Sequence, residues 1–283
     1  MAKIAAGSPP LVRVGIHFLV YALLLIVAVT CLVPFYSMLV TSTHTNADIA
    51  RKMLFLPGGE FVNNYMRLID TVNLWRGFLN TVYISVTSTV LALYFAALGG
   101  YGFSKYNFRF KGPLLLFVLA TMMLPGQLGI IGFFKMMDAM GLLNTYWPII
   151  LPSVSNAFGI FFMKQFADSS VPTEIVESGR IDGCREIGIF HRLIIPLLVP
   201  AIATLGIFTF IGNWNEFMLP MIILFENDKM PLAVMIASVR SYFFSDFGAQ
   251  HVGIVISIVP ILVFFSIASK RIISGVTAGA LKG

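Results

Sequence analysis

The amino-acid sequence predicts an all-α membrane protein with six transmembrane helices. Of the 283 residues, 58% are hydrophobic and only 11% are charged, and the apolar residues gather in long runs. A soluble globular domain has about 45–50% apolar and about 25% charged residues. The mean hydropathy of +0.87 supports the same class. At this length we expect a single transmembrane domain over residues 1–283.

Six segments are long and apolar enough to cross a bilayer, which takes about 20 mostly apolar residues. They cover residues 14–40, 77–104, 113–137, 146–168, 196–224 and 248–270. None alternates like a barrel strand, and in lipid only helices and closed barrels satisfy every backbone polar group, so we expect helices. The fourth run is the least regular, because it is interrupted by Pro148, Pro152, Ser153, Ser155 and Asn156. Such breaks are tolerated only against protein or water, so this helix should face inward.

The basic residues in the connections predict the orientation. With both termini on one side, that side carries twelve Lys and Arg, against seven on the other. Cytoplasmic loops are enriched in these residues, so we expect both termini and the charged connection at 169–196 to be cytoplasmic. Topology thus accounts for the net charge of +6, and no nucleic-acid partner is expected.

Patterns of catalytic and metal sites are missing from the sequence. The four histidines are scattered, Cys31 and Cys184 lie far apart, and neither HExxH nor GxSxG occurs. We therefore expect no catalytic residues, no metal and no cofactor bound by this chain. The dipeptide Gly-Lys never occurs, which excludes a phosphate-binding P-loop. If ATP drives transport here, the ATPase is another chain.

An ion-coupled secondary transporter and a membrane scaffold subunit remain alternatives, as does a membrane enzyme of unknown type. Ion-coupled carriers usually keep an ionisable group near the membrane midplane. The only acidic residue inside a span is Glu216, which follows Pro196 by about 30 Å along a helix and so lies near the outer surface. Ion coupling therefore has little support.

Charge is concentrated in the stretch PTEIVESGRIDGCREIGIFHRLIIPLLVP, residues 172–200. Pro172 suits a first helical position, Glu174 and Glu177 suit the amino end of a helix, and Gly183 suits its stop. A second short helix then leads to Pro196, where the fifth span begins. The stretch either docks in a groove of another protein or is a solvated loop that caps the bundle.

Two small residues, Ser178 and Gly179, would let a partner backbone approach the first of these helices closely. The stretch resembles the EAA loop of ABC-importer permeases, in which Glu-Ala-Ala is followed by three residues, Gly, nine residues and Ile-x-Leu-Pro. The spacing is kept from Glu177 through Gly183 to Pro196. Ser178 and Gly179 replace the two alanines, and glycine weakens a helix by about 1 kcal/mol against alanine.

The likeness covers about residues 75–283. NTVYISVTSTVLALYFAALGGYGFSKYNFRFKG (80–112), MMLPGQLGIIGFFKMM (122–137), NWNEFMLP (213–220) and GVTAGALKG (275–283) are similar to the carbohydrate branch of these permeases. Within that branch the chain is identified as a member of the smaller, maltose-type group of subunits. The resemblance implies a type I ABC importer fold in a bacterial inner membrane.

The resemblance also implies partners and residue roles. A second homologous permease would complete the path in the lipid bilayer, two ATPase subunits would bind ATP and Mg, and an extracytoplasmic binding protein would deliver a sugar. The segment 174–183 would be the coupling helix. The residues expected to contact an ATPase are Glu174, Glu177, Ser178, Gly179, Asp182, Gly183, Pro196 and, in the tail, Lys282.

Sugars are bound by amides and aromatic faces, so polar and aromatic residues in the spans are candidates for the substrate path. These are Gln127, Asn156, Asn213, Trp214, Asn215 and Glu216. Trp214 can instead anchor the chain at the membrane interface, and the other residues can instead join helices. Two external segments, 41–76 and 225–247, either receive the binding protein or only pack between spans. The sequence does not name the sugar.

Overall fold

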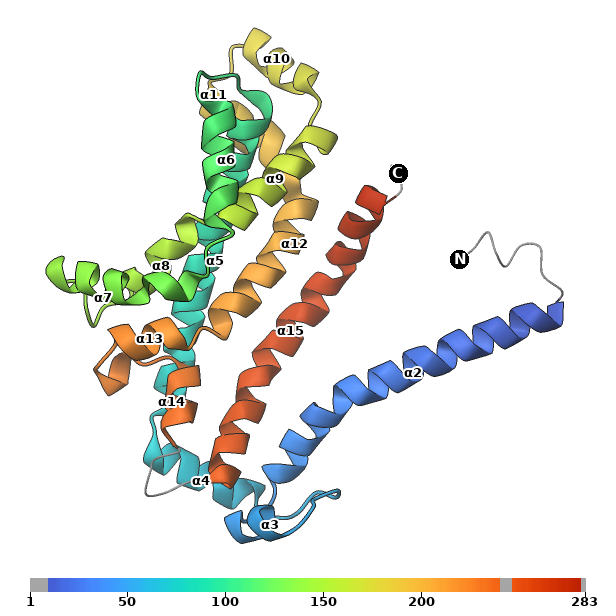
Figure 1. The fold of residues 1–283 in the computed structure, drawn as a ribbon, viewed down its shortest axis with the longest axis vertical. Coiled ribbons are helices and arrows are strands. Elements are labelled where there is room, and N and C mark those ends of the chain that lie inside the picture. Colours follow the sequence, from blue (N-terminus) through green and yellow to red (C-terminus); the bar gives the residue numbers. More distant parts are fainter. Residues whose placement is uncertain (1–9, 240–245, 281–283) are drawn as a thin grey trace. The chain divides into compact units, whose positions relative to one another are not determined.

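The computed structural model describes residues 10–239 and 246–280, with side chains placed for 15–239 and 246–266 (Figure 1). This described part is helical and contains no strand. The helices are α2 (Pro10–Thr41), α3 (Asn46–Arg51), α4 (Phe61–Thr71), α5 (Leu74–Lys105), α6 (Lys111–Thr121), η1 (Gly126–Gly129), α7 (Ile130–Ala139), α8 (Trp147–Val154), α9 (Ala157–Ser170), α10 (Thr173–Ile181), α11 (Glu186–Ile189), η2 (Phe190–Ile194), α12 (Ile195–Trp214), α13 (Met218–Ile223), η3 (Asn227–Lys229), α14 (Leu232–Ser238) and α15 (Phe247–Ala280).

By its contacts the chain divides into two compact units. Unit 1 comprises Met1–Thr71 and Val239–Ile256, and unit 2 comprises Val72–Ser238 and Ser257–Gly283. The first part of α15 therefore belongs to unit 1 and the rest to unit 2. This division does not test whether residues 1–283 fold as one domain, so that expectation stays a prediction.

Five helical segments of the described chain are long and apolar enough to cross a membrane. They are Gly15–Thr41, Leu74–Lys105, Trp147–Ser170, Glu186–Ile223 and Phe247–Ser266. Each overlaps a segment predicted from hydropathy, which confirms five of the six spans. The interruption expected in the fourth span is also present, because α8 ends at Val154 and α9 begins at Ala157.

The third predicted span, 113–137, is not one straight helix. The structure bends it by 90° between Lys111–Thr121 and Gly126–Ala139. The turn contains Pro125 and Gly126, and proline has no N–H to donate to the preceding turn while glycine adopts conformations closed to other residues. The prediction of a continuous helix over 113–137 is therefore wrong, and up to six spans result only if the bent pair counts as one.

Helix α5 is the centre of unit 2. It packs against α8, α9, α12 and α14. Small residues on both helices let α5 and α9 approach closely. A Cβ on Gly100 of α5 would lie 2.5 Å from the Cβ of Met163, and a Cβ on Gly159 of α9 would lie 3.0 Å from the Cβ of Ala96. Small residues spaced four apart are a common way to bring membrane helices together without a hydrophobic driving force. The residues around α5 therefore sit on a closely packed framework.

Candidate functional site

Helix α10 has the helix stop that the sequence predicts. It runs over Thr173–Ile181, and Gly183 follows with a φ of +76°, a conformation that glycine adopts without steric cost. The N–H of Cys184 donates to the carbonyl of Gly179 (2.9 Å), and that of Gly183 donates to Arg180 (3.0 Å). These two bonds form a Schellman motif, which satisfies the last carbonyls of a helix. The predicted helix and its turn at Gly183 are both confirmed.

Two faces of α10 differ in what they contact. Val176 and Gly179 are buried, and Val176 packs in a cluster with Ile189. The other face exposes Glu174, Glu177, Ser178, Asp182 and Ile181, whose side chain is 85% accessible. Ile187, at 72%, adds a second exposed apolar side chain outside the apolar bundle core. An exposed acidic and apolar surface on an ordered helix is therefore available to a partner.

Gly179 does not face that partner surface. A Cβ at this position would lie 2.9 Å from Leu193 Cδ1 and 3.1 Å from Ile189 Cγ1. The chain's own side chains thus occupy the space that we expected a partner backbone to use. Glycine at this position lets α10 pack closely on the segment that follows it, so for Gly179 the expected geometry is wrong.

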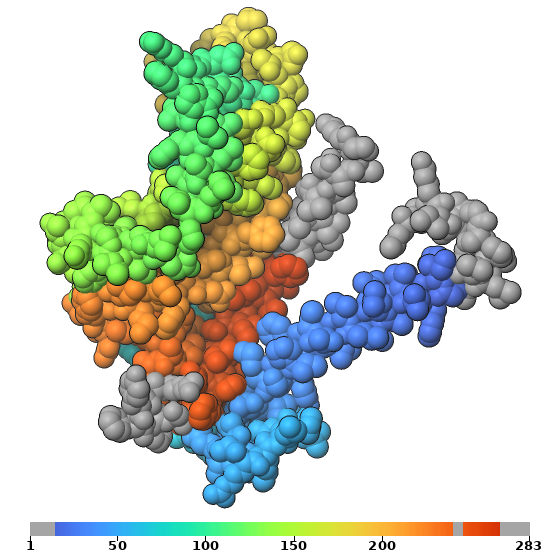
Figure 2. All heavy atoms as spheres, in the orientation of Figure 1, coloured from blue at the N-terminus to red at the C-terminus, as the bar shows by residue number. Residues whose placement is uncertain are grey.

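The predicted second short helix after α10 is present, but it continues into α12 without a break. Helix α11 is followed by the π-helical turn η2, in which the N–H of Ile195 donates to Phe190, and α12 begins at Ile195. Pro196 occupies the first turn of α12, where the missing N–H costs least. Figures 1 and 2 show α10, in yellow, at the end of unit 2. Lys282 lies outside the described residues.

A charged side chain of α10 is tied to the chain beyond it. Arg180 Nε donates to Glu186 Oε1 at 2.8 Å, and the Tyr106 hydroxyl donates to the same carboxylate. Burial, together with the hydrogen bond to Glu186, raises the pKa of Tyr106 well above its ordinary value. The phenol therefore remains a hydrogen-bond donor. Tyr106 and Glu186 were not singled out from the sequence, because they lie 80 positions apart and only the fold brings them together.

Two of the six substrate-path candidates share one pocket. Gln127 and Glu216 line a cavity of about 480 Å³, together with Gly126, Gly129, Ile130, Phe133, Pro152, Met218 and Leu219. Glu216 Oε1 accepts from the N–H of Leu219 at 3.1 Å. The bend after α6 forms one wall of this pocket. The dipeptide Pro125–Gly126 was the sequence signal for the bend, because Pro-Gly marks turns.

The other four candidates take separate positions. Asn156 caps α9 by accepting from the N–H of Gly159 (2.8 Å), and Asn213 donates to Thr89 Oγ1 (3.3 Å). Asn215 donates to its own helix. Trp214 is buried, its Nε1 donates to the carbonyl of Ser257 (3.1 Å), and its ring lines a second, largely apolar pocket with Thr89 and Phe210. The structure thus brings together only Gln127 and Glu216.

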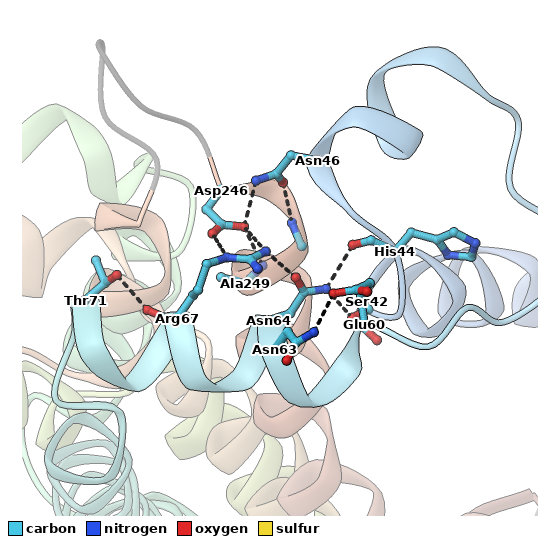
Figure 3. A network of polar contacts seen from close by, with 11 residues as sticks. Ser42, His44, Asn46, Glu60, Asn63, Asn64, Arg67, Thr71, Asp246 and Ala249 are labelled. Atoms are coloured by element: carbon cyan, nitrogen blue, oxygen red, sulfur yellow. Dashed lines mark hydrogen bonds and ion pairs between the residues drawn. The ribbon is translucent and has the colours of Figure 1, made fainter.

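Unit 1 contains a polar network within the predicted external segment 41–76 and at the start of α15 (Figure 3). The carboxylate of Asp246 accepts from Arg67 Nε (2.6 Å), Asn46 Nδ2 (3.1 Å) and the N–H of Ala249 (2.9 Å). These donors lower the pKa of Asp246 even though burial acts to raise it. The network fastens the amino end of α15 to α3 and α4.

A second part of this network is centred on Asn64, which is buried in α4. Its amide donates to the carbonyls of Ser42 (2.7 Å) and His44 (3.0 Å), and it accepts from Arg67. A Cβ on Gly248 would lie 2.7 Å from the Asn64 side chain. Only glycine therefore allows α15 to approach this close to Asn64.

The geometry can be compared with known proteins. A family model described as "Binding-protein-dependent transport system inner membrane component" matches residues 88–276. The arabinooligosaccharides transport system permease protein AraQ of Halalkalibacterium halodurans is 30% identical, covering 91% of this chain and 93% of that protein. The lactose transport system permease protein LacG of Rhizobium radiobacter is 29% identical, with coverages of 90% and 93%.

A solved structure is similar over nearly the whole chain. It belongs to a bacterial ABC transporter involved in the import of the acidic polysaccharide alginate, and it superposes with a TM-score of 0.78 at 28% identity. The match covers 90% of this chain and 96% of the other. The chain therefore belongs to the family of binding-protein-dependent transport system inner membrane components, and the relatives that it matches are permeases of sugar ABC transporters.

Proposed function

We propose that this chain and a second, homologous permease form the translocation path for a di- or oligosaccharide. An extracytoplasmic binding protein delivers the sugar, and two separate ATPase subunits, which bind ATP and Mg, drive the cycle. The permease breaks no bond; it alternates between inward- and outward-facing states whose populations shift with the partners bound. The family and the substrates named for its relatives support this proposal.

The observation that carries the coupling role is the exposed face of α10. Glu174, Glu177, Ser178 and Ile181 project from a helix that its own buried face and a Schellman turn hold in place. A rigid helix with a charged and apolar exposed face loses little entropy on docking in a groove. In the proposed complex these residues contact one ATPase, and Asp182, Gly183 and Pro196 set the direction of the chain behind them.

The orientation follows from the basic residues. Placing both termini and α10 in the cytoplasm puts the larger number of Lys and Arg inside, as membrane proteins prefer. The same placement exposes α10 to cytoplasmic ATPases. Contact of the tail, including Lys282, with the ATPase interface belongs to the proposal as well.

The pocket at Gln127 and Glu216 is the part of the chain best suited to contact a sugar. An amide and a carboxylate offer hydrogen bonds to hydroxyl groups, and the Phe133 ring supplies an apolar wall in the same cavity. The relatives' names mention arabinooligosaccharides and lactose, which are substrates of this size class. Asn213 and Asn156, by contrast, are each engaged within the chain.

Charge reversal at Glu177 tests the coupling role. In the complete complex, Glu177→Lys should insert normally but lose at least tenfold of its sugar uptake and of its substrate-stimulated ATP hydrolysis, because a basic site on the ATPase would then repel the helix. The matched control is Asp138→Lys, which reverses an exposed acid at the end of α7. A helix-start charge that only favours the dipole is worth about 0.3–1 kcal/mol and would leave uptake nearly unchanged. Normal uptake in Glu177→Lys would overturn the assignment.

A further inference from the structure

Helix α10 is attached to the carboxyl end of α5 at two points. Before α10, Asp168 in the last turn of α9 accepts a hydrogen bond from Ser104 of α5 at 2.6 Å. Asp168 also forms an ion pair with Lys164 at 2.6 Å. After α10, Glu186 accepts from Tyr106, the residue that follows the last residue of α5. Asp168 and Glu186, which lie on either side of α10, are therefore both bonded to residues 104–106 at the carboxyl end of α5.

The second attachment is a closed triangle of side chains. Both oxygens of Glu186 accept from Arg180, at 2.8 Å from Nε and 3.3 Å from Nη2. The guanidinium carbon lies 5.5 Å from the centre of the Tyr106 ring, and the Tyr106 hydroxyl donates back to Glu186. Bidentate pairing fixes the orientation of the guanidinium against the carboxylate, and the ring below it adds a cation–π attraction. Each of the three residues contacts the other two, so the triangle joins the last turn of α10, the start of α11 and the residue that follows α5.

Aromatic contacts connect the triangle to the apolar core of unit 2. The Tyr106 ring meets Tyr101 edge-on at 5.4 Å, and Tyr101 stacks on Phe190 at 5.8 Å. Phe190 is buried in the same cluster as Val176 of α10. Beyond these contacts, α10 is joined to the spans through Pro172, the turn at Gly183 and the packing of Gly179 on Leu193.

The opposite end of α5 holds a different segment. Asn80 donates to the carbonyls of Asp228 (2.8 Å) and Met230 (3.0 Å), and Thr81 accepts from the N–H of Leu232 (2.8 Å). Helix α5 is 32 residues long, which corresponds to about 48 Å at 1.5 Å per residue. One continuous helix thus connects the residues that attach α10 to the predicted external loop 225–247.

We infer that Glu186 is the positioning residue that joins α10 to the carboxyl end of α5, through Arg180 and Tyr106, so that a displacement of α10 is passed to α5. This inference rests on the proposed function and adds the route by which movement of α10 reaches the spans. The displacement is passed to Ser104 of α5 and to Tyr106, the residue after α5; it then reaches, along the helix, the loop held by Asn80 and Thr81. Loss of the Glu186 joint would leave α10 held to α5 only by the apolar cluster around Val176, so that α10 could tilt against α5 when the ATPase moves it.

A crosslink that replaces the joint tests the inference. In a background with Cys31 and Cys184 changed to serine, Tyr106→Cys and Glu186→Cys are combined in the complete complex reconstituted in liposomes. Before crosslinking, sugar transported per ATP hydrolysed should fall at least fivefold, because the joint is lost. A short bis-methanethiosulfonate crosslinker between the two cysteines should restore the ratio to within twofold of the background. If the crosslinked complex hydrolyses ATP without transport, the joint must open in each cycle and the inference is wrong.

Conservative single variants provide the second readout. Tyr106→Phe and Glu186→Gln should each lower the transport-to-hydrolysis ratio, and the double variant should be no worse than the more affected single one, because both remove the same joint. Tyr21→Phe, which removes an exposed phenol from α2, is the matched control. Fully additive effects, or unchanged ratios, would contradict a shared joint. Failure of the proposed function can be told apart from failure of this inference. In that case the unmodified protein would show no ATP-dependent uptake, and no ATPase would purify with it.

Discussion

Two carboxylates of this chain each accept from an arginine and from at least one further donor, but their side chains differ in exposure. The side chain of Asp246 in unit 1 is 4% exposed, and that of its partner Arg67 is 42% exposed. In unit 2 the side chains of Glu186 and Arg180 are 49% and 42% exposed. Asp246 also accepts from a backbone N–H, whereas both donors to Glu186 in the described structure are side chains.

The difference in exposure indicates different roles. A buried carboxylate must keep its partners, because an unpaired charge away from water is costly. The Asp246 network therefore contributes mainly to the stability of unit 1. An exposed ion pair contributes little to stability, since water can replace either partner. The Glu186 joint is better suited to determining an angle between two helices than to holding the fold together.

Replacing each carboxylate by its amide should give the largest difference between the two sites, in stability and in transport. Asp246→Asn should reduce the free energy of unfolding by about 2 kcal/mol, because it leaves Arg67 without its charge partner and turns one acceptor into a donor. Glu186→Gln should change stability little, while lowering the ratio of transport to ATP hydrolysis. Both can be measured by SDS titration in mixed micelles and by uptake in liposomes. Equal losses of stability in the two variants would show that exposure does not distinguish them.

Acid should affect the two sites differently, with a smaller effect than either substitution. The hydrogen bonds from Arg67, Ala249 and Asn46 outweigh burial and lower the pKa of Asp246, so its contribution to stability is complete above its ordinary pKa and is lost as the pH falls through the lowered value. Stability of the unmodified protein should therefore fall below about pH 4 more steeply than that of Asp246→Asn. Parallel curves for the two proteins would contradict this.

A rise in pH should leave the bond between Tyr106 and Glu186 intact. Burial raises the pKa of Tyr106, and its bond to Glu186 adds to that shift, so the phenol keeps its proton even at its ordinary pKa of about 10, where a free tyrosine is half ionised. The hydrogen bond should therefore persist from neutral pH to about pH 9. The difference in coupling between Tyr106→Phe and the unmodified complex should stay constant over that range.

Sequence patterns predicted the elements that depend on local signals. Five spans follow from apolar runs, and the stop of α10 follows from Gly183, whose left-handed conformation suits glycine. The 90° bend after α6 was missed because apolar composition continues across Pro125–Gly126, so that hydropathy alone reads one span.

The contacts between distant residues could not be predicted in the same way. Tyr106 and Glu186, like Arg67 and Asp246, come together only through the packing of helices, and no spacing in the sequence encodes such a pair. Gly179 shows the same limit, since its small size fits a partner's backbone or the chain's own Leu193 equally well. Gln127 and Glu216 share a pocket because the unexpected bend brings η1 beside α13.

The most direct test of the account is a photo-crosslink from α10 to the ATPase in intact cells. A photoreactive amino acid at Ser178, on the exposed face of α10, should produce a covalent adduct with the ATPase subunit, identified by mass spectrometry. The same group at Trp75, exposed at the other end of α5, should give no such adduct. An ATPase adduct from position 75, or an adduct from position 178 with a protein outside the cytoplasm, would contradict both the orientation and the coupling role of α10.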